Sequence, residues 1–573
     1  MVILGYMMKY GSDYEETYAP TADAVSIRML AVLSTRLRFS VKVADVETAF
    51  LVPKMDKIVY VKALLWYEQL VAELSDLPIP TSLPPGACRQ LMKGVPGIKQ
   101  GSRLFYKTIK EVLVKHDYLV HPADACVFIR QPTPPKPTLQ FAALAVWVDD
   151  VFAVVKDDME WEVLLKVLRS AFTVADKGDV SMFLGMEIRQ SPDKSTITLS
   201  QRISIDNLLS RAKSSMKSLH PAPTPCVAGF IFTKADCPLI PQPRPARMPE
   251  IRGFIALAGY IAHWTRGEIV FVVNKCCKYM ANPGDKHIDA FERLLRYLIG
   301  TRDYGLVYRF DSTVTPLVAD SDSSHMDCVD TSQSTLAYLF LFCGNLVSWY
   351  SKLHTFVTTC SNHSEYAAMF QAAKEAQYLL NWLTPILSFL GITVTPIPIF
   401  NDYDGASALA KDPVGRFKNK HVAVQHHYTQ ELVAANVIIP VRVDTSENKS
   451  DLLTKALGPT VFPKLAVSLV GQITDRVAPL VLMFHPVGTK PASVQRVCEI
   501  GTQCDFETDL AHLTPTINAP HAQNTARATQ ESQALGSAAA PPIKLKQGHC
   551  SYCKRNGHTL FHCRRRVNDH KDL

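Results

Sequence analysis

The sequence predicts a multidomain α+β protein that ends in a disordered tether and a small Cys/His module. The chain has 573 residues, more than one hydrophobic core usually holds, and 47% of them are hydrophobic. Short apolar runs alternate with helical patterns over residues 13–200 and again from Leu317. Residues 512–548 are rich in Ala, Thr, Gln, Pro and Ser but poor in aromatic residues, so we expect them to be disordered.

The composition limits the classes of function. Lys and Arg number 61 against 53 Asp and Glu, a net charge of +8 that suits a nucleic-acid partner without requiring one. The 14 cysteines are mostly scattered and no secretory signal opens the chain, which indicates a reduced, intracellular protein. The apolar stretch Leu465–Val487 is broken by Asp475 and Arg476, so we do not expect it to span a membrane.

The run FAALAVWVDDVFAVV at residues 141–155 predicts two short buried strands joined by a turn that carries Asp149 and Asp150. Unpaired buried charges are costly, so an acidic pair in such a run usually binds cations. With a third carboxylate, the pair is suited to hold two divalent ions about 3.5–4 Å apart for in-line phosphoryl transfer. The alternative is an exposed Asp-Asp turn without a ligand.

The other elements follow from periodicity. Val41, Val43, Asp45 and Glu47 alternate as on a strand. Prolines between residues 221 and 249 predict a stiff linker, and the pattern from Ile251 to Tyr308 is helical. Beyond Leu317 we expect strands at Ala337–Phe342, Leu346–Trp349 and Ile397–Phe400 and a helix over about residues 364–383.

Four further acids stand near the ends of predicted elements in this second α+β region. They are Asp320, Glu365, Asp402 and Asp451. If these side chains converge, they would hold two Mg²⁺ ions and activate a water molecule against a phosphodiester. Their spacing along the chain does not by itself establish that they converge.

A Cys/His cluster lies near the end of the sequence. Cys550, Cys553, His558 and Cys563 form C-x2-C-x4-H-x4-C, a set of three thiolates and one imidazole that suits tetrahedral Zn²⁺. Aromatic and basic neighbours in this module would stack on unpaired bases and contact phosphates. These nucleic-acid-binding candidates are Tyr552, Lys554, Arg555 and Phe561.

Several motifs in order resemble the reverse transcriptases of copia-type retrotransposons. They are residues 16–51, ACRQLMKGVPGIKQGSRLFYKTI (87–109), WVDD (147–150), FLGMEI (183–188) and ITLSQ (197–201). The resemblance implies a right-hand polymerase with palm, fingers and thumb over residues 1–228. It also implies that Asp45, Asp149 and Asp150 are the catalytic triad and bind Mg²⁺ or Mn²⁺.

The same resemblance implies residues that contact the substrates. Phe50 would be the aromatic gate that excludes a ribose 2′-hydroxyl, with a core phenylalanine as the alternative. Gln100 would contact the nucleotide, and Lys99 and Arg103 flank it. For Lys99 and Arg103 the alternative is ordinary surface charge. Gly185 and Met186 would belong to a turn, Phe183 to Met186, that grips the primer, where glycine lets a backbone approach the strand.

A second group of motifs resembles the ribonuclease H domain of these elements. It comprises DSDSSH (320–325), SNHSEYAA (361–368), NDYDGASALAKDP (401–413), NKHVAVQHHY (419–428) and SENKSDLLTKAL (446–457). The resemblance implies that Asp320, Glu365, Asp402 and Asp451 are catalytic acids in a ribonuclease H-like α/β domain. The Cys/His module resembles a retroelement zinc knuckle, although in the family this module precedes the polymerase.

Taken together, the resemblance divides the chain into five segments. These are a reverse transcriptase (1–228), a connection (229–310), a ribonuclease H-like domain (311–462), an extension with a disordered linker (463–546) and a CCHC zinc knuckle (547–567). The implied partners are an RNA and DNA template-primer, an RNA–DNA hybrid and deoxynucleoside triphosphates, with no membrane, and the oligomeric state stays open. The implied location is intracellular, in cytoplasmic virus-like particles, the nucleus or both.

Some positions depart from the family pattern. A fingers strand with a KARLVA-like run is missing at the start, and Trp147, Pro96, His363 and Ala423 replace family residues. Protease and integrase signatures do not precede the polymerase region. Two alternatives therefore stay open beside an active enzyme: a catalytically inactive relic that binds nucleic acid through the knuckle, and a cellular protein domesticated from such an element.

Overall fold

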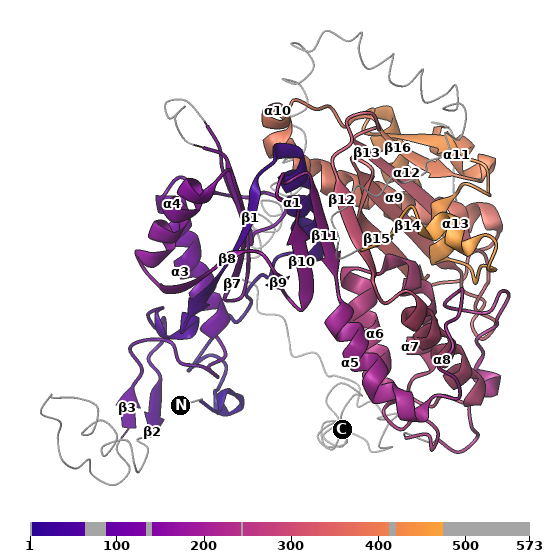
Figure 1. Cartoon of the computed structure of the whole chain (residues 1–573), viewed down its shortest axis with the longest axis horizontal. Coiled ribbons are helices and arrows are strands. Elements are labelled where there is room, and N and C mark those ends of the chain that lie inside the picture. The colour runs from indigo at the N-terminus through magenta and orange to yellow at the C-terminus, as the bar shows by residue number, and fades with distance from the viewer. Residues whose placement is uncertain (1–2, 63–87, 133–139, 242–243, 412–419, 474–573) are drawn as a thin grey trace, which may run out of the picture. The chain divides into compact units, whose positions relative to one another are not determined.

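The computed structural model describes residues 3–62, 88–132, 140–241, 244–411 and 420–473 (Figure 1). Within these residues the strands form three larger sheets and one two-stranded ribbon of β2 (Tyr60–Lys62) and β3 (Cys88–Gln90). The architecture is mixed α/β, as the sequence predicts. The zinc-knuckle residues lie outside the described residues, and so does the tether.

The first sheet is antiparallel where it carries the predicted acids, with strand order β4-β5-β6-β7-β1-β8. Strand β1 (Ser40–Glu47) lies between β7 (Asp150–Val155) and β8 (Thr173–Asp179). The remaining strands are β4 (Leu119–Val120), β5 (Val127–Arg130) and β6 (Ala142–Trp147). The predicted hairpin of residues 141–155 is thus confirmed as β6 and β7, with Val148 and Asp149 in the turn.

Helices cover both faces of this sheet, which explains why its strands β5, β6 and β7 are almost continuously apolar. Helix α1 (Ala24–Leu37), capped by the Asp23 side chain, packs on the face that carries Val41 and Val43. Helices α3 (Gly101–Lys115) and α4 (Asp158–Arg169) pack on the face that carries Ala44 and Val46 (Figure 1). The acids at the sheet end are therefore held by strands fixed from both sides.

The second sheet has the order β18-β12-β11-β10-β9. Its strands are β9 (Met182–Phe183), β10 (Met186–Gln190), β11 (Thr196–Ser200), β12 (Tyr304–Arg309) and β18 (Gly471–Gln472). The prediction of a helical pattern up to Tyr308 is wrong at its end, because the last helix there, α8 (Asp285–Gly300), stops at Gly300 and β12 pairs with β11. Leu306 and Tyr308 are buried on either side of half-buried Val307, which is strand alternation.

Helices connect the two α+β regions. They are α5 (Arg202–Ala212), α6 (Ile251–Trp264), α7 (Val270–Tyr279) and α8 (Asp285–Gly300). The proline-rich stretch before α6 was predicted to be a stiff linker, but it packs against the helices. Phe232 is buried, and the Tyr279 hydroxyl donates a hydrogen bond to its carbonyl.

The third sheet is mixed, with the order β15-β14-β13-β16-β17. Its strands are β13 (Leu317–Ser324), β14 (Thr335–Phe342), β15 (Asn345–Leu353), β16 (Ile397–Asn401) and β17 (Ile438–Arg442). Strands β13, β14 and β15 pair antiparallel, whereas β16 lies parallel to both β13 and β17. The predicted strands of this region are confirmed as β14, β15 and β16.

Helix α9 (Ser361–Leu383) packs on β13 and β14 and confirms the predicted helix. Two further helices, α11 (Asp404–Lys411) and α12 (Lys420–Ala434), pack on α9 (Figure 1). The short helix η7 (Lys449–Leu453) follows β17 and carries Asp451. In the parts of the chain that the structure describes, no helix has the length and apolarity needed to cross a membrane.

Candidate active sites

The first acidic centre consists of Asp45, Asp149 and Asp150. Asp45 on β1 is the direct cross-strand partner of Asp150 at the start of β7. Asp149 lies in the turn before β7, and its carbonyl accepts a hydrogen bond of 2.9 Å from the Val46 amide. The sheet register therefore brings together residues that are more than a hundred positions apart in the sequence.

A lysine that the sequence pattern does not indicate, Lys177, contacts two of these acids. Lys177 Nζ on β8 is 3.1 Å from Asp45 Oδ1 and 3.5 Å from Asp150 Oδ1. Both carboxylates remain about one-third exposed. Asp45 and Asp150 therefore both direct a carboxylate oxygen at the same positive charge, the Lys177 ammonium.

The electrostatics of the centre reflect this crowding. Burial raises the pKa of Asp150, and the charges of Asp149 and Asp45 raise it further, while Lys177 acts in the opposite direction. Desolvation lowers the pKa of Lys177, but its hydrogen bond to Asp45 and the nearby carboxylates outweigh this, so the pKa is raised overall. The lysine is therefore held as an ammonium.

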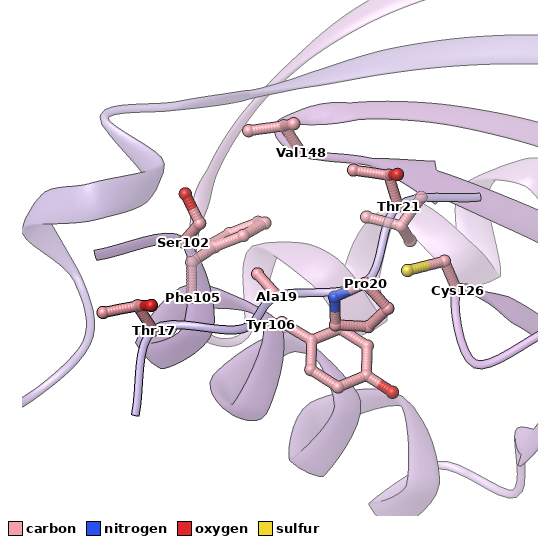
Figure 2. A pocket seen from close by; sticks show the side chains of 10 residues that line it. Thr17, Ala19, Pro20, Thr21, Ser102, Phe105, Tyr106, Cys126 and Val148 are labelled. Atoms are coloured by element: carbon pink, nitrogen blue, oxygen red, sulfur yellow. The ribbon is translucent and has the colours of Figure 1, made fainter. Parts of the chain in front are cut away.

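A cavity of about 240 Å³ lies behind the turn that carries Asp149 (Figure 2). Val148 of that turn, Phe105 and Tyr106 of α3 and the segment from Thr17 to Thr21 line it. Cys126 also lines the cavity, and burial raises the pKa of its thiol to about 12, so it is not a nucleophilic thiolate. The back of the turn is thus bounded by uncharged side chains.

The second acidic centre consists of Asp322, Glu365, Asp402 and Asp451. Carboxylate oxygens of Asp322, Glu365 and Asp402 all lie within 4.8 Å of one another. They come from β13, from near the start of α9 and from the residue after β16, respectively. Asp451 on η7 joins them through Lys455, whose ammonium contacts both Asp451 and Asp322.

The family resemblance predicts Asp320 at this centre, but in the structure Asp322 lies there with Glu365 and Asp402. Both side chains lie on one face of β13, because residues i and i+2 of a strand point the same way. Asp320 is buried beside Lys449, whose amide lies 3.3 Å from Asp320 Oδ1. Asp322 lies two residues further along β13, next to Glu365 of α9 and to Asp402, which follows β16.

Burial dominates the electrostatics of this centre. It raises the pKa of Glu365 to about 7, with the Asp402 charge adding to the effect and the Asn401 amide opposing it. It also raises the pKa of Asp322, to which the Glu365 charge contributes. Several buried carboxylates that share one site are the donor set expected for a hard divalent cation.

Comparison with known proteins identifies one domain of the chain. Residues 1–228 match the family described as reverse transcriptase (RNA-dependent DNA polymerase). The chain is 28% identical over 474 residues to the retrovirus-related Pol polyprotein from transposon TNT 1-94 of Nicotiana tabacum, covering 82% of this chain and 34% of that protein. It is also 30% identical over 235 residues to the uncharacterized mitochondrial protein AtMg00810 of Arabidopsis thaliana, covering 40% of this chain and 92% of that protein.

The chain therefore contains a reverse transcriptase domain over residues 1–228. It spans about a third of the length of the tobacco Pol polyprotein. Among solved structures, the foamy viral protease-reverse transcriptase in complex with RNA/DNA hybrid is 13% identical, with a TM-score of 0.38 over 73% of this chain and 45% of that one.

Within the reverse transcriptase domain, the predicted substrate-binding residues differ in how far their side chains are exposed. Lys99 is exposed, and Phe50 is half-buried with its ring 6.4 Å from that of Phe105. Gly185 has a φ of +66° and forms the predicted turn between β9 and β10. Met186, however, is fully buried in the core, so its side chain is not presented to a substrate.

Gln100 and Arg103 are held by the N-terminal segment of the domain. Gln100 is fully buried, and its amide donates a hydrogen bond of 3.0 Å to the Asp13 carbonyl. Arg103 is buried and pairs with Asp56 and Glu16, so the alternative of ordinary surface charge is wrong for it. A nucleotide reaches Gln100 only if the segment around Asp13 moves aside.

Proposed function

We propose that this chain is an RNA-directed DNA polymerase with ribonuclease H activity. The observation that carries the first activity is the cross-strand pairing of Asp45 with Asp150 beside the turn of Asp149. The second activity is supported by the four acids of the second acidic centre, on a mixed sheet covered by α9. The template-primer, RNA–DNA hybrid and deoxynucleotide substrates are part of this proposal.

The residues of the first acidic centre fit a divalent cation. Asp45 and Asp150 already direct oxygen atoms at one ammonium group, and a hard cation prefers such oxygens. Asp45, Asp149 and Asp150 would hold Mg²⁺ or Mn²⁺, which would activate a primer 3′-hydroxyl and neutralise the triphosphate. Phe50, which follows β1 along the chain, would select deoxynucleotides, and the turn at Gly185 would hold the primer strand.

The residues of the second acidic centre fit the same kind of ion. Asp322, Glu365 and Asp402 bring their oxygens within 4.8 Å of one another, and Asp451 lies next to them. These acids would hold Mg²⁺ or Mn²⁺, which would activate water against the RNA strand of a hybrid. Asp320 lies beside Lys449, two residues before Asp322 on β13, and would support the site through packing and charge.

A third part of the proposal concerns residues 547–567. Cys550, Cys553, His558 and Cys563 would bind one Zn²⁺ ion, and the aromatic and basic residues between them would bind single-stranded nucleic acid. In so short a module the metal would supply most of the folding free energy.

Primer extension on an RNA template tests the polymerase proposal. Asp149→Asn should reduce extension at least about a hundredfold, because it removes an oxygen charge from the metal site. Glu162→Gln on the exposed face of α4 removes the same charge elsewhere and should leave extension unchanged. Equal extension by both variants, or none by the unmutated chain, would contradict the proposal.

Cleavage of an RNA–DNA hybrid tests the nuclease proposal separately. Asp322→Asn should abolish cleavage and leave primer extension intact, because the two acidic centres lie on different sheets. Cleavage that persists in Asp322→Asn would remove the second centre from the proposal.

The second candidate is a chain that binds nucleic acid without chemistry. The burial of Gln100 and the pairing of Arg103 favour it, because both groups would have to be released to meet a nucleotide. Under this candidate, the unmutated chain would bind single-stranded RNA but would neither extend a primer nor cleave a hybrid.

A further inference from the structure

Lys455 places an ammonium group inside the second acidic centre. Its Nζ is 2.5 Å from Asp451 Oδ1 and 3.3 Å from Asp322 Oδ2. The neighbouring Thr454 hydroxyl donates a hydrogen bond to the same Asp322 oxygen. Both side chains belong to the turn after η7, so one short stretch of chain brings a donor and a cation to the acids.

The ammonium lies on the Asp451 side of the four acids, where it contacts Asp451 and Asp322. Asp322, Glu365 and Asp402 bring their oxygens within 4.8 Å of one another, and Asp451 is not part of that set. Asp451 directs its Oδ1 at Lys455 and also interacts with Asp322. One side of the centre therefore carries the three clustered carboxylates, and on the other side Lys455 neutralises Asp451 and also contacts Asp322.

The charge of Lys455 acts across the whole centre. Burial raises the pKa of Asp322, Glu365 and Asp451, and the ammonium opposes that rise at each of them. Without a cation, four carboxylates in such a place would repel one another strongly. The lysine thus allows the acids to stay close together in the metal-free protein.

We propose that Lys455 is a built-in counter-ion on the Asp451 side of the centre. The first divalent cation then binds to Asp322, Glu365 and Asp402, and a second one binds only by displacing the ammonium. The inference rests on the proposed nuclease function for the identity of the cation. Lys455 is in this sense a positioning residue, since it acts on the ion through the acids.

The side chain of Lys455 is suited to leave the site. It is 35% exposed, so the ammonium has a path to water. Lysine carries its charge on a flexible four-carbon stem and is strongly hydrated, whereas arginine would hold a carboxylate in a rigid fork. Displacement by a divalent cation therefore costs the ammonium only its ion pairs, because water can replace them.

Direct Mn²⁺ binding tests the proposal without measuring activity. Free Mn²⁺ would be measured by electron paramagnetic resonance on the full chain, with Asp150→Asn as background to weaken the first acidic centre. We expect one tight and one weak ion, and Lys455→Gln should raise the affinity of the weak ion about tenfold, more than that of the tight ion. Lys455→Arg keeps the charge and should not show this gain.

Lys464→Gln is the matched control, because it removes the same charge from an exposed position on α13 (Phe462–Ala466). Equal affinities for the weak ion in Lys455→Gln and Lys464→Gln would overturn the inference. This result would overturn the inference about Lys455 even if the unmutated chain cleaves RNA–DNA hybrids. Conversely, a chain that shows the expected gain but cleaves nothing would count against the nuclease function alone.

A second measurement uses the unmutated chain, and so does not depend on the folding of a variant. Acetylation by an amine-reactive ester, followed by peptide mass spectrometry, reports how accessible each lysine is. Lys455 should be protected without metal and should become reactive over the Mg²⁺ range that fills the weak site, whereas Lys464 should not change. A Lys455 reactivity that is independent of Mg²⁺ would overturn the inference.

Discussion

Asp45 and Asp150 are direct cross-strand partners on β1 and β7, and Lys177 on β8 bridges their carboxylates. The contact explains how the two acids stay close without a bound metal ion. It also means that the ammonium and a divalent cation compete for the same oxygens. Water can replace the ion pairs of Lys177, because its side chain is half exposed.

Replacing Lys177 should therefore change the metal requirement of primer extension. In Lys177→Gln the competing charge is absent, so we expect the Mg²⁺ concentration for half-maximal extension to fall by roughly twofold to tenfold. The measurement is a Mg²⁺ titration of extension at constant ionic strength. Lys166→Gln on the exposed face of α4 is the control. An unchanged or higher Mg²⁺ requirement in Lys177→Gln would contradict the prediction.

Glu365 should make the metal-free protein less stable as the pH rises. Its pKa is raised from an ordinary 4.5 to about 7, so the folded protein holds a proton that the unfolded chain loses in this window. Stability from this group is then present below about pH 4.5 and is lost as the pH rises towards 7, by at most about 3 kcal/mol. Thermal unfolding in a chelator between pH 5 and pH 8 measures the loss.

Glu365→Gln tests the assignment of that loss. The amide does not titrate, so the melting temperature of this variant should depend less on pH than that of the unmutated chain. Glu162→Gln removes an exposed carboxylate and should keep the full pH dependence. If both variants show the same slope, another group is responsible.

Local patterns predicted much of the fold. The hairpin of β6 and β7 follows from an apolar run interrupted by two aspartates, and α9 follows from a long helical pattern. Strand β12 was missed because its few residues continue the apolar content of α8, and its partner β11 lies about a hundred residues earlier. Pairing over such a distance leaves no local signal.

The sites show the same limit. Asp320 and Asp322 alternate on one face of β13, so the sequence alone does not say which of them meets Glu365 and Asp402. That choice depends on the register between β13 and β16 and on how α9 packs. Lys177 could not be predicted because Asp45 lies 132 residues before it, whereas Lys455, four residues after Asp451, had a local signal in its spacing.

Gly185 provides a test of backbone strain at the turn between β9 and β10. Its φ of +66° is unfavourable for other residues, so Gly185→Ala should destabilise the protein by about 1 kcal/mol. Its added methyl group would lie 3.5 Å from the Tyr260 hydroxyl, an ordinary contact, so strain and not a clash is the cause.

Gly253→Ala on α6 is the matched control for Gly185→Ala. No atom outside the adjoining stretch of α6 lies within 4 Å of the added methyl group, and alanine has a higher helix propensity than glycine, so this change should stabilise the protein by up to about 1 kcal/mol. Denaturant unfolding of both variants measures the difference. A shift of the same sign in both would contradict the role of the positive φ at Gly185.

The Cys/His module predicts a zinc-dependent contribution to nucleic-acid binding. Substitution of the bound metal by Co²⁺ in the full chain should give the absorption bands of a four-coordinate thiolate site. Cys553→Ser should lose these bands and should bind single-stranded RNA more weakly, because the module no longer folds around the metal. Removing the metal with a chelator should weaken RNA binding by the unmutated chain but not by Cys553→Ser.

Cys360→Ser is the control for that experiment, because it removes an exposed cysteine that lies outside the module. This variant should keep both the cobalt bands and the chelator-sensitive RNA affinity. If the bands survive in Cys553→Ser but disappear in Cys360→Ser, the metal is held by cysteines other than those of the C-x2-C-x4-H-x4-C motif. If the chelator does not change the RNA affinity of any variant, RNA binding depends on the rest of the chain.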